Sequence, residues 1–504
     1  MADLSRFFVA SSLAVSVVVF LLLGFRRRRP SLKLPPGPAG WPFVGNLFQI
    51  AFAGKPMIHL VRDLRLRYGP IFTLRMGVRT LIVVTSPELV HEALIEKGQL
   101  FASRPAESTI RAVFSCDKFT VNSAVYGPEW RSLRRNMVSG MLSASRLREF
   151  HPARVSAMDR FVQRLRAEAE ANGGAVWVLR NARFAVFAIL LSMTFGVTLE
   201  EDEIVRIDEM MKRVLLCISP RMDDYLPFLG PFYAKHQRKV LQVRKEQVET
   251  VTALINRRRA ILNDRRIEPH AAPFSYLDSL LDLKVDGRDC APSEPQLVTL
   301  CSEFINGGTD TTSTAIEWAM ARIIDNPNIQ AKLHEEIVAT VGDRPVDDRD
   351  IEKLTYLQAF VKELLRKHPP TYFSLTHAAV ELAKLGGYDI PPDANLELFL
   401  PTISEDPRLW SNPLEFNPDR FITGGEAADI TGSAGIRMIP FGAGRRICPG
   451  LAMGTTHIGL MVARMVQAFE WQLHPSEPKL DFMDKVEFTI VMKRRLLALV
   501  KPRN

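Results

Sequence analysis

The chain has 504 residues, and its 47% hydrophobic and 24% charged residues are the balance of a globular protein. Its net charge is +9, but much of this lies in residues 1–30, which contain Arg6 and Arg26–Arg29 and a single acidic residue, Asp3. The rest of the chain therefore lacks the basic surplus of a nucleic-acid-binding protein. The five cysteines form no CxxC pair, which excludes a disulfide framework or a cysteine-rich zinc site and fits a reducing compartment.

The first segment of the chain predicts a membrane anchor. Residues 7–25 carry no charge, and as a helix they would be about 28 Å long, close to the hydrocarbon core of a bilayer. Arg26–Arg29 follow directly, whereas a cleaved signal peptide carries its positive charge before a shorter apolar run. By the positive-inside tendency, these arginines stay in the cytosol. We therefore expect residues 1–29 to be a single-pass anchor, with the body of the protein facing the cytosol.

Residues 30–46 contain the run LPPGPAGWPFVGN and predict a proline-rich hinge, since proline lacks the backbone N–H and fixes φ. No second linker, repeat or low-complexity tract follows. Residues 47–504 are therefore expected to form one folded domain.

The periodicity of this domain is mostly helical. Residues 71–85 are rich in β-branched side chains around Gly77 and predict a hairpin. Helical patterns then dominate from about residue 87 to residue 368. Two β-leaning stretches follow, at 387–403 and 486–500. The predicted fold class is mainly α with a minor β part.

The longest predicted helix covers residues 294–325. Ser293 and Gln296 form a capping box, and Pro295 is tolerated in the first turn. Pro327 ends the helix, which would be about 45 Å long.

The centre of this helix, NGGTDTT at 306–312, is a poor helix-forming sequence. Gly307 and Gly308 together cost about 2 kcal/mol relative to alanine, so a functional site is suspected there. The glycines leave space for a small ligand, Thr311 offers a hydroxyl, and Asp310 offers a carboxylate that can exchange protons with solvent. The alternative is close helix packing over the glycines, with a threonine that bonds back to its own turn.

Two further pairs are weak signals when taken alone. Trp130 and Arg134 in EWRSLRRN lie on one side of a helical turn, as in any amphipathic surface helix. Glu363 and Arg366 are three residues apart and could be an ordinary surface ion pair.

Residues 441–450, FGAGRRICPG, which we call the cysteine loop, carry the strongest signal. Gly442 and Gly444 allow a tight turn and the close approach of a flat ligand. Helical spacing resumes at Leu451, so Cys448 precedes a helix N-terminus, where the dipole and free N–H groups favour a thiolate. With a phenylalanine for an aromatic face and arginines for carboxylates, this setting fits a haem iron with an axial sulfur. The alternative is a buried cysteine in a glycine-rich turn.

The pattern F-x-x-G-x-R-x-C-x-G in the cysteine loop, together with the run at 306–312, resembles the cytochrome P-450 family of haem-thiolate monooxygenases. The resemblance extends from the N-terminal anchor to the last strands and implies a single triangular domain that binds haem b. It implies Cys448 as the metal ligand. The other cofactor-binding residues that it implies are Phe441, Gly442, Gly444, Arg446, Gly450, Trp130, Arg134, His377, Gly307 and Gly308.

The same resemblance assigns the remaining site residues. Thr311 and Asp310 take the proton-delivery roles of catalysis. Glu363, Arg366 and Arg420, in FNPDRF, form a structural network that holds the cysteine loop. The chain departs from the family in carrying Asp419 and Glu405 where glutamate and arginine are usual, which concerns fold detail rather than chemistry.

Electrons must come from another protein, because no GxGxxG motif follows a strand in this chain. The resemblance implies an NADPH-dependent, flavin-containing reductase in the endoplasmic reticulum membrane, with cytochrome b5 as a second candidate donor. Membrane lipid is expected as a further partner, and nucleic acid is not. Arg131, Arg135, Arg445 and Lys239 are candidates for a basic docking face, and ordinary solvated charges are the alternative.

The strings HPPTYFSLTHAAVELAKLGGYDIP, SEFINGGTDTT and LPTISEDPRLW resemble the plant P-450 family seventy-seven. Its members hydroxylate or epoxidise fatty acids within the chain, for cutin-type polyesters. The predicted pocket segments are 108–121, 211–233 and 371–376, whose phenylalanines suit an extended apolar substrate. They are Phe114, Phe119, Phe228, Phe232 and Phe373.

Three alternatives stay open. The substrate could be a terpenoid, a steroid or a phenylpropanoid. The enzyme could be a hydroperoxide isomerase or dehydratase that needs no reductase, although such relatives tend to lose the threonine found here at 311. The protein could also be a membrane-anchored haem sensor without turnover.

Overall fold

The computed structural model describes residues 32–264, 273–286, 291–422 and 428–503. The predicted anchor lies outside these residues. Among the described helices, one, α9 (Val178–Phe195), is long and apolar enough to cross a membrane. Most of its surface is buried inside the protein, so α9 is a core helix.

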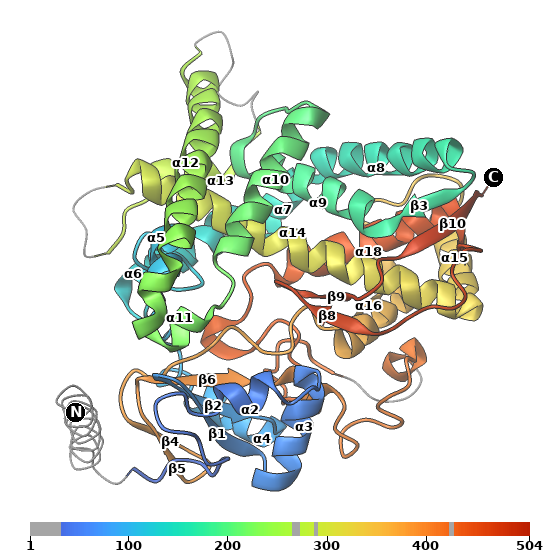
Figure 1. Cartoon of the computed structure of the whole chain (residues 1–504). Helices are drawn as coiled ribbons and strands as arrows, with labels where there is room; N and C mark the ends of the chain where they lie inside the picture. The colour runs from blue at the N-terminus through green and yellow to red at the C-terminus, as the bar shows by residue number, and fades with distance from the viewer. Residues whose placement is uncertain (1–31, 265–272, 287–290, 423–427, 504) are drawn as a thin grey trace, which may run out of the picture.

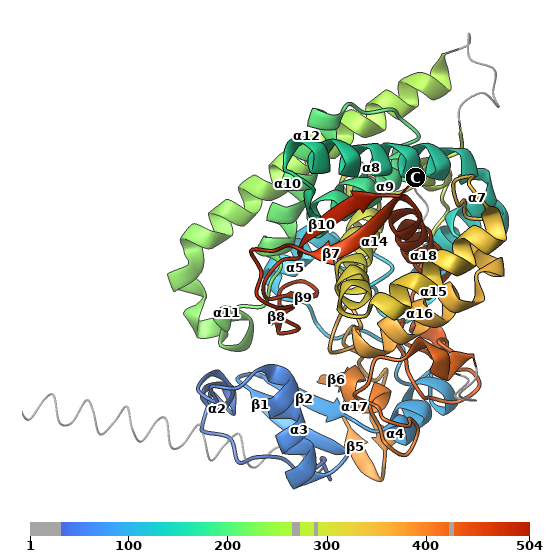
Figure 2. The same cartoon turned by 90° about the vertical axis from the view of Figure 1, so that its right-hand side faces the viewer.

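Most of the described chain is helical, as predicted, and the helices fill the larger part of the molecule (Figure 1). The long helix α14 (Glu294–Asp325) runs through the middle of this part and packs against α9 and α18 (Leu451–Ala468), as Figure 2 also shows. The other helices of this part are α5 (Thr109–Ser115), α6 (Pro128–Arg135), α7 (Ala144–Glu149), α8 (His151–Ala171), α10 (Glu201–Cys217), α11 (Met222–Tyr225), α12 (Ala234–Asn263), α13 (Tyr276–Leu281), α15 (Pro327–Val341) and α16 (Thr355–Lys367).

A smaller part containing β-strands lies below the helices in Figure 1. Its main sheet is the antiparallel hairpin β1 (Ile71–Met76) and β2 (Arg79–Val84), joined in parallel by β6 (Ala394–Leu398). The hairpin predicted around Gly77 is therefore confirmed. The remaining elements are α2 (Leu47–Ala51), α3 (Met57–Tyr68), α4 (Pro87–His91), the hairpin of β4 (Ala383–Leu385) and β5 (Tyr388–Ile390), and α17 (Leu400–Ser404).

The two β-leaning stretches near the C-terminus differ in detail from the prediction. The stretch at 387–403 ends in the helix α17, whose Pro401 occupies a first-turn position where its missing N–H has no cost. The stretch at 486–500 divides between two sheets. The first contains β8 (Asp484–Val486) and β9 (Ile490–Met492), and in the second β10 (Leu497–Pro502) pairs with both β3 (Ala175–Trp177) and β7 (Phe469–Leu473).

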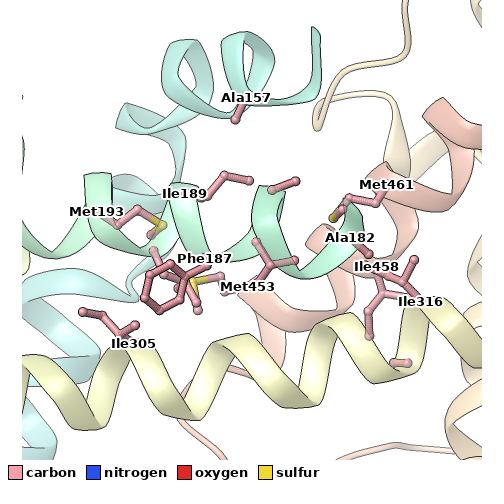
Figure 3. Packing of buried hydrophobic residues seen from close by; sticks show 14 of the residues in the cluster. Ala157, Ala182, Phe187, Ile189, Met193, Ile305, Ile316, Met453, Ile458 and Met461 are labelled. Carbon is pink, nitrogen blue, oxygen red and sulfur yellow. The ribbon is translucent and has the colours of Figure 1, made fainter. Parts of the chain in front are cut away.

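Helix α14 has the predicted bounds and the predicted capping box. The backbone N–H of Ser293 donates to the side-chain oxygen of Gln296 at 2.9 Å. Beyond this cap, side chains of three helices meet in one buried core, as Figure 3 shows for Ile305 of α14, Phe187 of α9 and Met453 of α18. This packing holds α14 against both α9 and the cysteine-loop helix α18.

The described part of the proline-rich segment has no helix, as predicted. It is attached to the β-containing part by backbone hydrogen bonds. Thr73 of β1 donates its N–H to the carbonyl oxygen of Pro36 at 2.8 Å, and the N–H of Lys33 donates to the carboxylate of Asp389 at 2.8 Å. This segment therefore directs the chain along the edge of the β1 sheet.

Candidate functional site

The shape of the cysteine loop depends on two glycines. Gly442 and Gly444 have φ angles of +70° and +66°, in the left-handed region that favours glycine. A Cβ on Gly444 would overlap the carbonyl oxygen of Leu94, whereas a Cβ on Gly442 would meet no atom within 4 Å. The loop closes where the N–H of Cys448 donates to the carbonyl oxygen of Phe441 at 2.8 Å. Gly444 thus permits close backbone packing against Leu94, and Gly442 borders open space.

Cys448 lies just before α18, whose N-cap is Gly450. Burial raises the pKa of Cys448, while a hydrogen bond from the backbone of Gly450 and the positive charge of Arg134 lower it. The backbone N–H at the helix N-terminus favours the thiolate, as the sequence predicted, but burial penalises the charged form more strongly. A metal cation reverses this balance, since a coordinating thiol is deprotonated.

Arginine side chains from two segments meet beside the cysteine loop. Arg446 donates to the carbonyl oxygens of Ala102 at 2.6 Å and Ala124 at 2.6 Å, and its guanidinium lies 4.3 Å from the ring centre of Trp130. Arg134, one turn along α6 from Trp130, donates to the carbonyl oxygen of Ile447 at 2.7 Å. The predicted residues of α6 are therefore brought against the cysteine loop.

Arg104 extends this cationic cluster, and His377, which is uncharged at neutral pH, lies beside it. Burial, and then the charges of Arg104 and Arg134, lower the pKa of Arg446 to about 9. Burial and the charge of Arg104 lower the pKa of His377 to about 3. Sequence reasoning missed Arg104, because a single arginine before a proline has no periodicity or motif to mark it. Its guanidinium donates to the carbonyl oxygens of Leu375 and Thr376, each at 2.8 Å.

The chemistry of this cluster fits a ligand with carboxylates. In the described part of the chain, no carboxylate lies within ion-pair distance of Arg104, Arg134 or Arg446. Buried cations are normally paired, so these three would gain from two acidic groups placed next to Cys448. Haem b is flat and carries two propionates, and the residues present therefore fit it.

The two glycines of α14 have different surroundings. A Cβ on Gly308 would lie 2.9 Å from the side chain of Leu190 on α9, whereas a Cβ on Gly307 would meet nothing within 4 Å. Gly308 therefore serves helix packing, the alternative considered from the sequence, and Gly307 leaves open space. Thr311 donates its hydroxyl to the carbonyl oxygen of Gly307 at 2.8 Å. The hydroxyl thus bonds within its own turn and must turn away to act on a ligand.

Asp310 is held by an arginine of α9 rather than facing solvent freely. Its Oδ1 pairs with Arg183, which also binds Asp208 of α10 through Nε and Nη2 at 3.0 and 2.7 Å. Lys212, half exposed, completes the chain of charges by pairing with Asp208 at 2.7 Å. Burial raises the pKa of Asp310, against the lowering influence of Arg183. The second oxygen of Asp310 is buried and has no protein partner.

Glu363, Arg366 and Arg420 form one buried network, as the resemblance to the family implied. The carboxylate of Glu363 accepts two hydrogen bonds from Arg366 at 2.7 Å and one from Arg420 at 3.1 Å. Arg366 also donates to the carbonyl oxygens of Ser404, Pro413 and Glu415. The network thus joins α16 to the segment that leads to the cysteine loop.

The two departures from the family each have a local partner. Glu405 binds Arg62 of α3 and the ammonium of Lys367 at 2.6 Å. Asp419 pairs with Lys332 of α15 at 2.8 Å. Glu405 therefore links α3 of the β-containing part to α16, and Asp419 links the 418–421 turn to α15. Neither residue lies in the cationic cluster.

A cleft of about 820 Å³ opens between the β1 sheet, α5 and α11. It includes the start of the first predicted pocket segment and part of the second. Phe114 and Phe119 are buried in the core, and neither is among the residues that line this cleft. The prediction is wrong for Phe228 and Phe232, which are 65% and 84% exposed on the outer surface. The turn that carries them packs on α2 through smaller apolar side chains, which directs both rings outward.

Three of the four arginine and lysine residues suggested for docking lie together. Arg131 and Arg445 stand over the ring of Tyr126 at 5.9 and 5.8 Å, and Arg135 is exposed on the same helix as Arg131. Lys239 lies on α12 near the charged groups of α10, and does not belong to this face. The basic face beside the cysteine loop therefore contains arginines of α6 and of the loop itself.

The chain belongs to the cytochrome P450 family, whose family model matches residues 35–499. The fold agrees, because a zebra fish cytochrome P450 solved with progesterone has a TM-score of 0.74 and 23% identity, over 89% of this chain and 100% of the other. The protein is therefore a haem-thiolate monooxygenase of mainly helical fold.

Its relatives include plant enzymes that match over nearly their whole length. Cytochrome P450 89A9 of Arabidopsis thaliana is 33% identical over 99% of this chain and 98% of the relative. Cytochrome P450 98A1 of Sorghum bicolor is 34% identical, with coverages of 98% and 96%. Flavonoid 3'-monooxygenase of Arabidopsis thaliana is 31% identical, with coverages of 98% and 97%.

Proposed function

We propose that this cytochrome P450 binds haem b through Cys448 and inserts oxygen within the chain of a fatty acid. The observation that carries the haem assignment is the position of Cys448 on a glycine-shaped loop, beside three arginines that lack carboxylate partners among the described residues. When bound, a thiolate-ligated haem takes up electrons one at a time, activates O₂ and oxidises a nearby C–H or C=C bond.

The protein's own groups would orient the cofactor and move protons. Arg104, Arg134 and Arg446 neutralise the propionates, and the open space beside Gly307 admits O₂. The Thr311 hydroxyl would leave its bond to the Gly307 carbonyl and hold a proton beside the open space at Gly307. The buried oxygen of Asp310, which has no protein partner, would pass protons toward this hydroxyl.

The membrane setting and the electron donor belong to the same proposal. A reductase that uses NADPH, or cytochrome b5, docks on the face formed by Arg131, Arg135 and Arg445. The predicted anchor places the enzyme in the endoplasmic reticulum membrane. Phe52, Phe228 and Phe232, exposed near α2, add apolar contacts to lipid.

The fatty-acid substrate is supported by the resemblance of three segments to the plant family seventy-seven, and by the size of the cleft. Its volume of about 820 Å³ lies within the range of pockets that bury small ligands. Related plant enzymes named ent-isokaurene C2/C3-hydroxylase and flavonoid 3'-monooxygenase favour a terpenoid or a phenylpropanoid as the second candidate. The threonine at position 311 counts against a hydroperoxide isomerase or dehydratase.

The test is expression in microsomes with a plant reductase, followed by incubation with saturated and unsaturated fatty acids, diterpenes and flavonoids. NADPH-dependent in-chain hydroxy or epoxy fatty acids are expected. The matched control is the Cys448→Ala variant, which should be inactive. Oxidation of diterpenes or flavonoids alone would overturn the fatty-acid assignment and leave the monooxygenase in place.

A further inference from the structure

One side of the long helix α14 stays accessible although the helix runs through the core. Glu303, Gly307 and Thr311 follow one another at intervals of four residues, so they lie on the same side of the helix. Each of them keeps part of its surface accessible, whereas Phe304 and Thr309 are buried. Gly307 borders the open space described above. Glu303 therefore lies one helical turn from that space.

The carboxylate of Glu303 binds the backbone of the segment between α5 and α6. The N–H of Val121 donates to Oε2 at 2.9 Å, and the N–H of Asn122 donates to Oε1 at 2.7 Å. Burial raises the pKa of Glu303 to about 7, and these two donors oppose that increase. An ionised carboxyl accepts both hydrogen bonds and makes them stronger than neutral ones. Glu303 thus fixes two successive residues of this segment, which we call segment 119–124.

The other side of segment 119–124 is bound by residues beside the cysteine loop. The carbonyl oxygen of Val121 accepts hydrogen bonds from Trp130 Nε1 and Arg446 Nη1, each at 3.1 Å. The peptide unit between Val121 and Asn122 therefore has its C=O on a guanidinium and its N–H on the carboxylate of Glu303. Hydrogen bonds in such a chain polarise one another and become stronger. The segment thus connects α14 to the cysteine-loop side of the site.

The turn that leads into segment 119–124 has a strained backbone. Cys116, Asp117 and Lys118 have φ angles of +49°, +56° and +69°, in the left-handed region that costs free energy for residues other than glycine. Strain of this kind persists only where the surroundings hold it, and it is concentrated at functional sites. The Ser115 hydroxyl holds the N–H of Lys118 at 2.9 Å. Beyond the turn, the two hydrogen bonds to Glu303 hold the chain in place.

We propose that Glu303 is a positioning residue of the monooxygenase reaction, whose carboxylate holds segment 119–124 as a wall of the space beside Gly307 and Thr311. With this wall in place, a substrate in the space is confined and water is excluded. Without the two hydrogen bonds, the strained turn relaxes and the segment moves away from α14. This role concerns the shape of the site, and it holds for a fatty acid as for any other apolar substrate.

Amide hydrogen exchange in the purified holoenzyme tests the contact directly. It is measured by mass spectrometry with single-residue resolution at about pH 8, where a carboxyl with a pKa of about 7 is ionised. In wild type the amides of Val121 and Asn122 should be protected. Glu303→Gln replaces one acceptor oxygen by an NH₂ group that cannot accept, so one of the two amides should exchange about tenfold faster. Glu303→Met, which has no acceptor oxygen, should release both.

Two haem ligands of different length test the effect on the site. Imidazole and 1-dodecylimidazole both bind the haem iron, and the shift of the Soret band gives their affinities. Only the dodecyl chain reaches the walls of the space. Both variants should therefore bind imidazole as wild type does, whereas Glu303→Met should bind 1-dodecylimidazole about tenfold more weakly, with Glu303→Gln between the two. A general loss of structure would weaken both ligands together.

The matched control is Glu294→Gln, the same change at a partly exposed carboxylate of α14 that pairs with Arg259 at 3.2 Å. It should behave as wild type in both experiments. If Glu303→Met does not bind haem, the isosteric Glu303→Gln decides alone.

The role of Glu303 is refuted if the amides of residues 121 and 122 exchange at wild-type rates in the variants. Faster exchange with unchanged binding of 1-dodecylimidazole, or an equal loss for both ligands, would also overturn it. Because neither ligand is a fatty acid, these outcomes are independent of whether the enzyme oxidises fatty acids.

Discussion

Replacing Arg183 by methionine would leave the Asp310 carboxylate buried without its cation. The side chains of Arg183, Asp208 and Asp310 are 11%, 14% and 19% exposed. Breaking a buried ion pair by removing one partner costs about 3–5 kcal/mol. Asp208 keeps Lys212 at 2.7 Å, so the uncompensated charge is that of Asp310. We therefore expect a loss near the lower limit, about 3 kcal/mol in the free energy of unfolding at neutral pH.

The loss should depend on pH with a defined sign. The pKa of Asp310 is raised by burial, and Arg183 opposes that increase. Without Arg183 the pKa rises further. A carboxyl whose pKa is higher in the folded state binds protons better there, so stability falls as pH increases above the unfolded value of about 4 and stops falling above the folded pKa. In the variant this decline extends to higher pH than in wild type, and acidification restores part of the stability.

Urea denaturation of the holoenzyme at about pH 5.5 and pH 8 measures both effects. Arg183→Met should be less stable than wild type by a larger margin at pH 8. Combining it with Asp310→Asn, which removes the buried charge, should recover most of the loss. Arg180→Met, at an exposed arginine of α9 that pairs with Glu168, is the control and should change stability by less than about 1 kcal/mol. Equal stability of Arg183→Met and wild type at both pH values would refute the reasoning.

The remaining predictions concern the haem side and the anchor. Cys448→Ala should abolish the shifted Soret band of the reduced CO complex, and a retained thiolate-type band would exclude Cys448 as the ligand. Thr311→Val should keep that band but consume NADPH without forming product, measured as the ratio of product to NADPH; full coupling would contradict the proton role. Gly308→Ala should cost about 1–3 kcal/mol by urea denaturation, because its methyl group would lie 2.9 Å from a leucine of α9. Gly307→Ala, which meets nothing within 4 Å, should be neutral or stabilising by up to about 1 kcal/mol. Deletion of residues 1–30 should weaken retention in membrane fractions and leave the haem spectrum unchanged; unchanged retention would show that another surface anchors the protein.

Features with local causes could be predicted closely. The bounds of α14 follow from Ser293 and Gln296 at one end and Pro327 beyond the other, all within a few residues of the termini that they fix. The hairpin at Gly77 follows from β-branched runs on both sides of a residue that adopts a positive φ.

The neighbours of the predicted site residues could not be predicted from the sequence, because they come from distant segments. The sequence predicted that the Asp310 carboxylate exchanges protons with solvent. In the structure it is paired with Arg183, which lies on a different helix and reaches Asp310 only because α9 packs on α14. Phe228 and Phe232 have the composition of pocket walls, and the packing of their turn on α2 directs them outward. Apolar composition shows that a side chain can be buried, not which side of its backbone the core occupies.

The sequence alone determined the cysteine loop and the long central helix with its glycine-threonine run, because these depend on short spacings and on backbone conformations that few residue types permit. The Glu363–Arg366–Arg420 network was implied only by the resemblance to the family, since Arg420 is distant from the other two residues along the chain. The tertiary structure decided which groups face each other across distant segments. It placed Arg104 with Arg446 and His377, and it separated Lys239 from the other docking arginines. Such contacts arise from the packing of helices and sheets in three dimensions, and no periodicity along the chain encodes them.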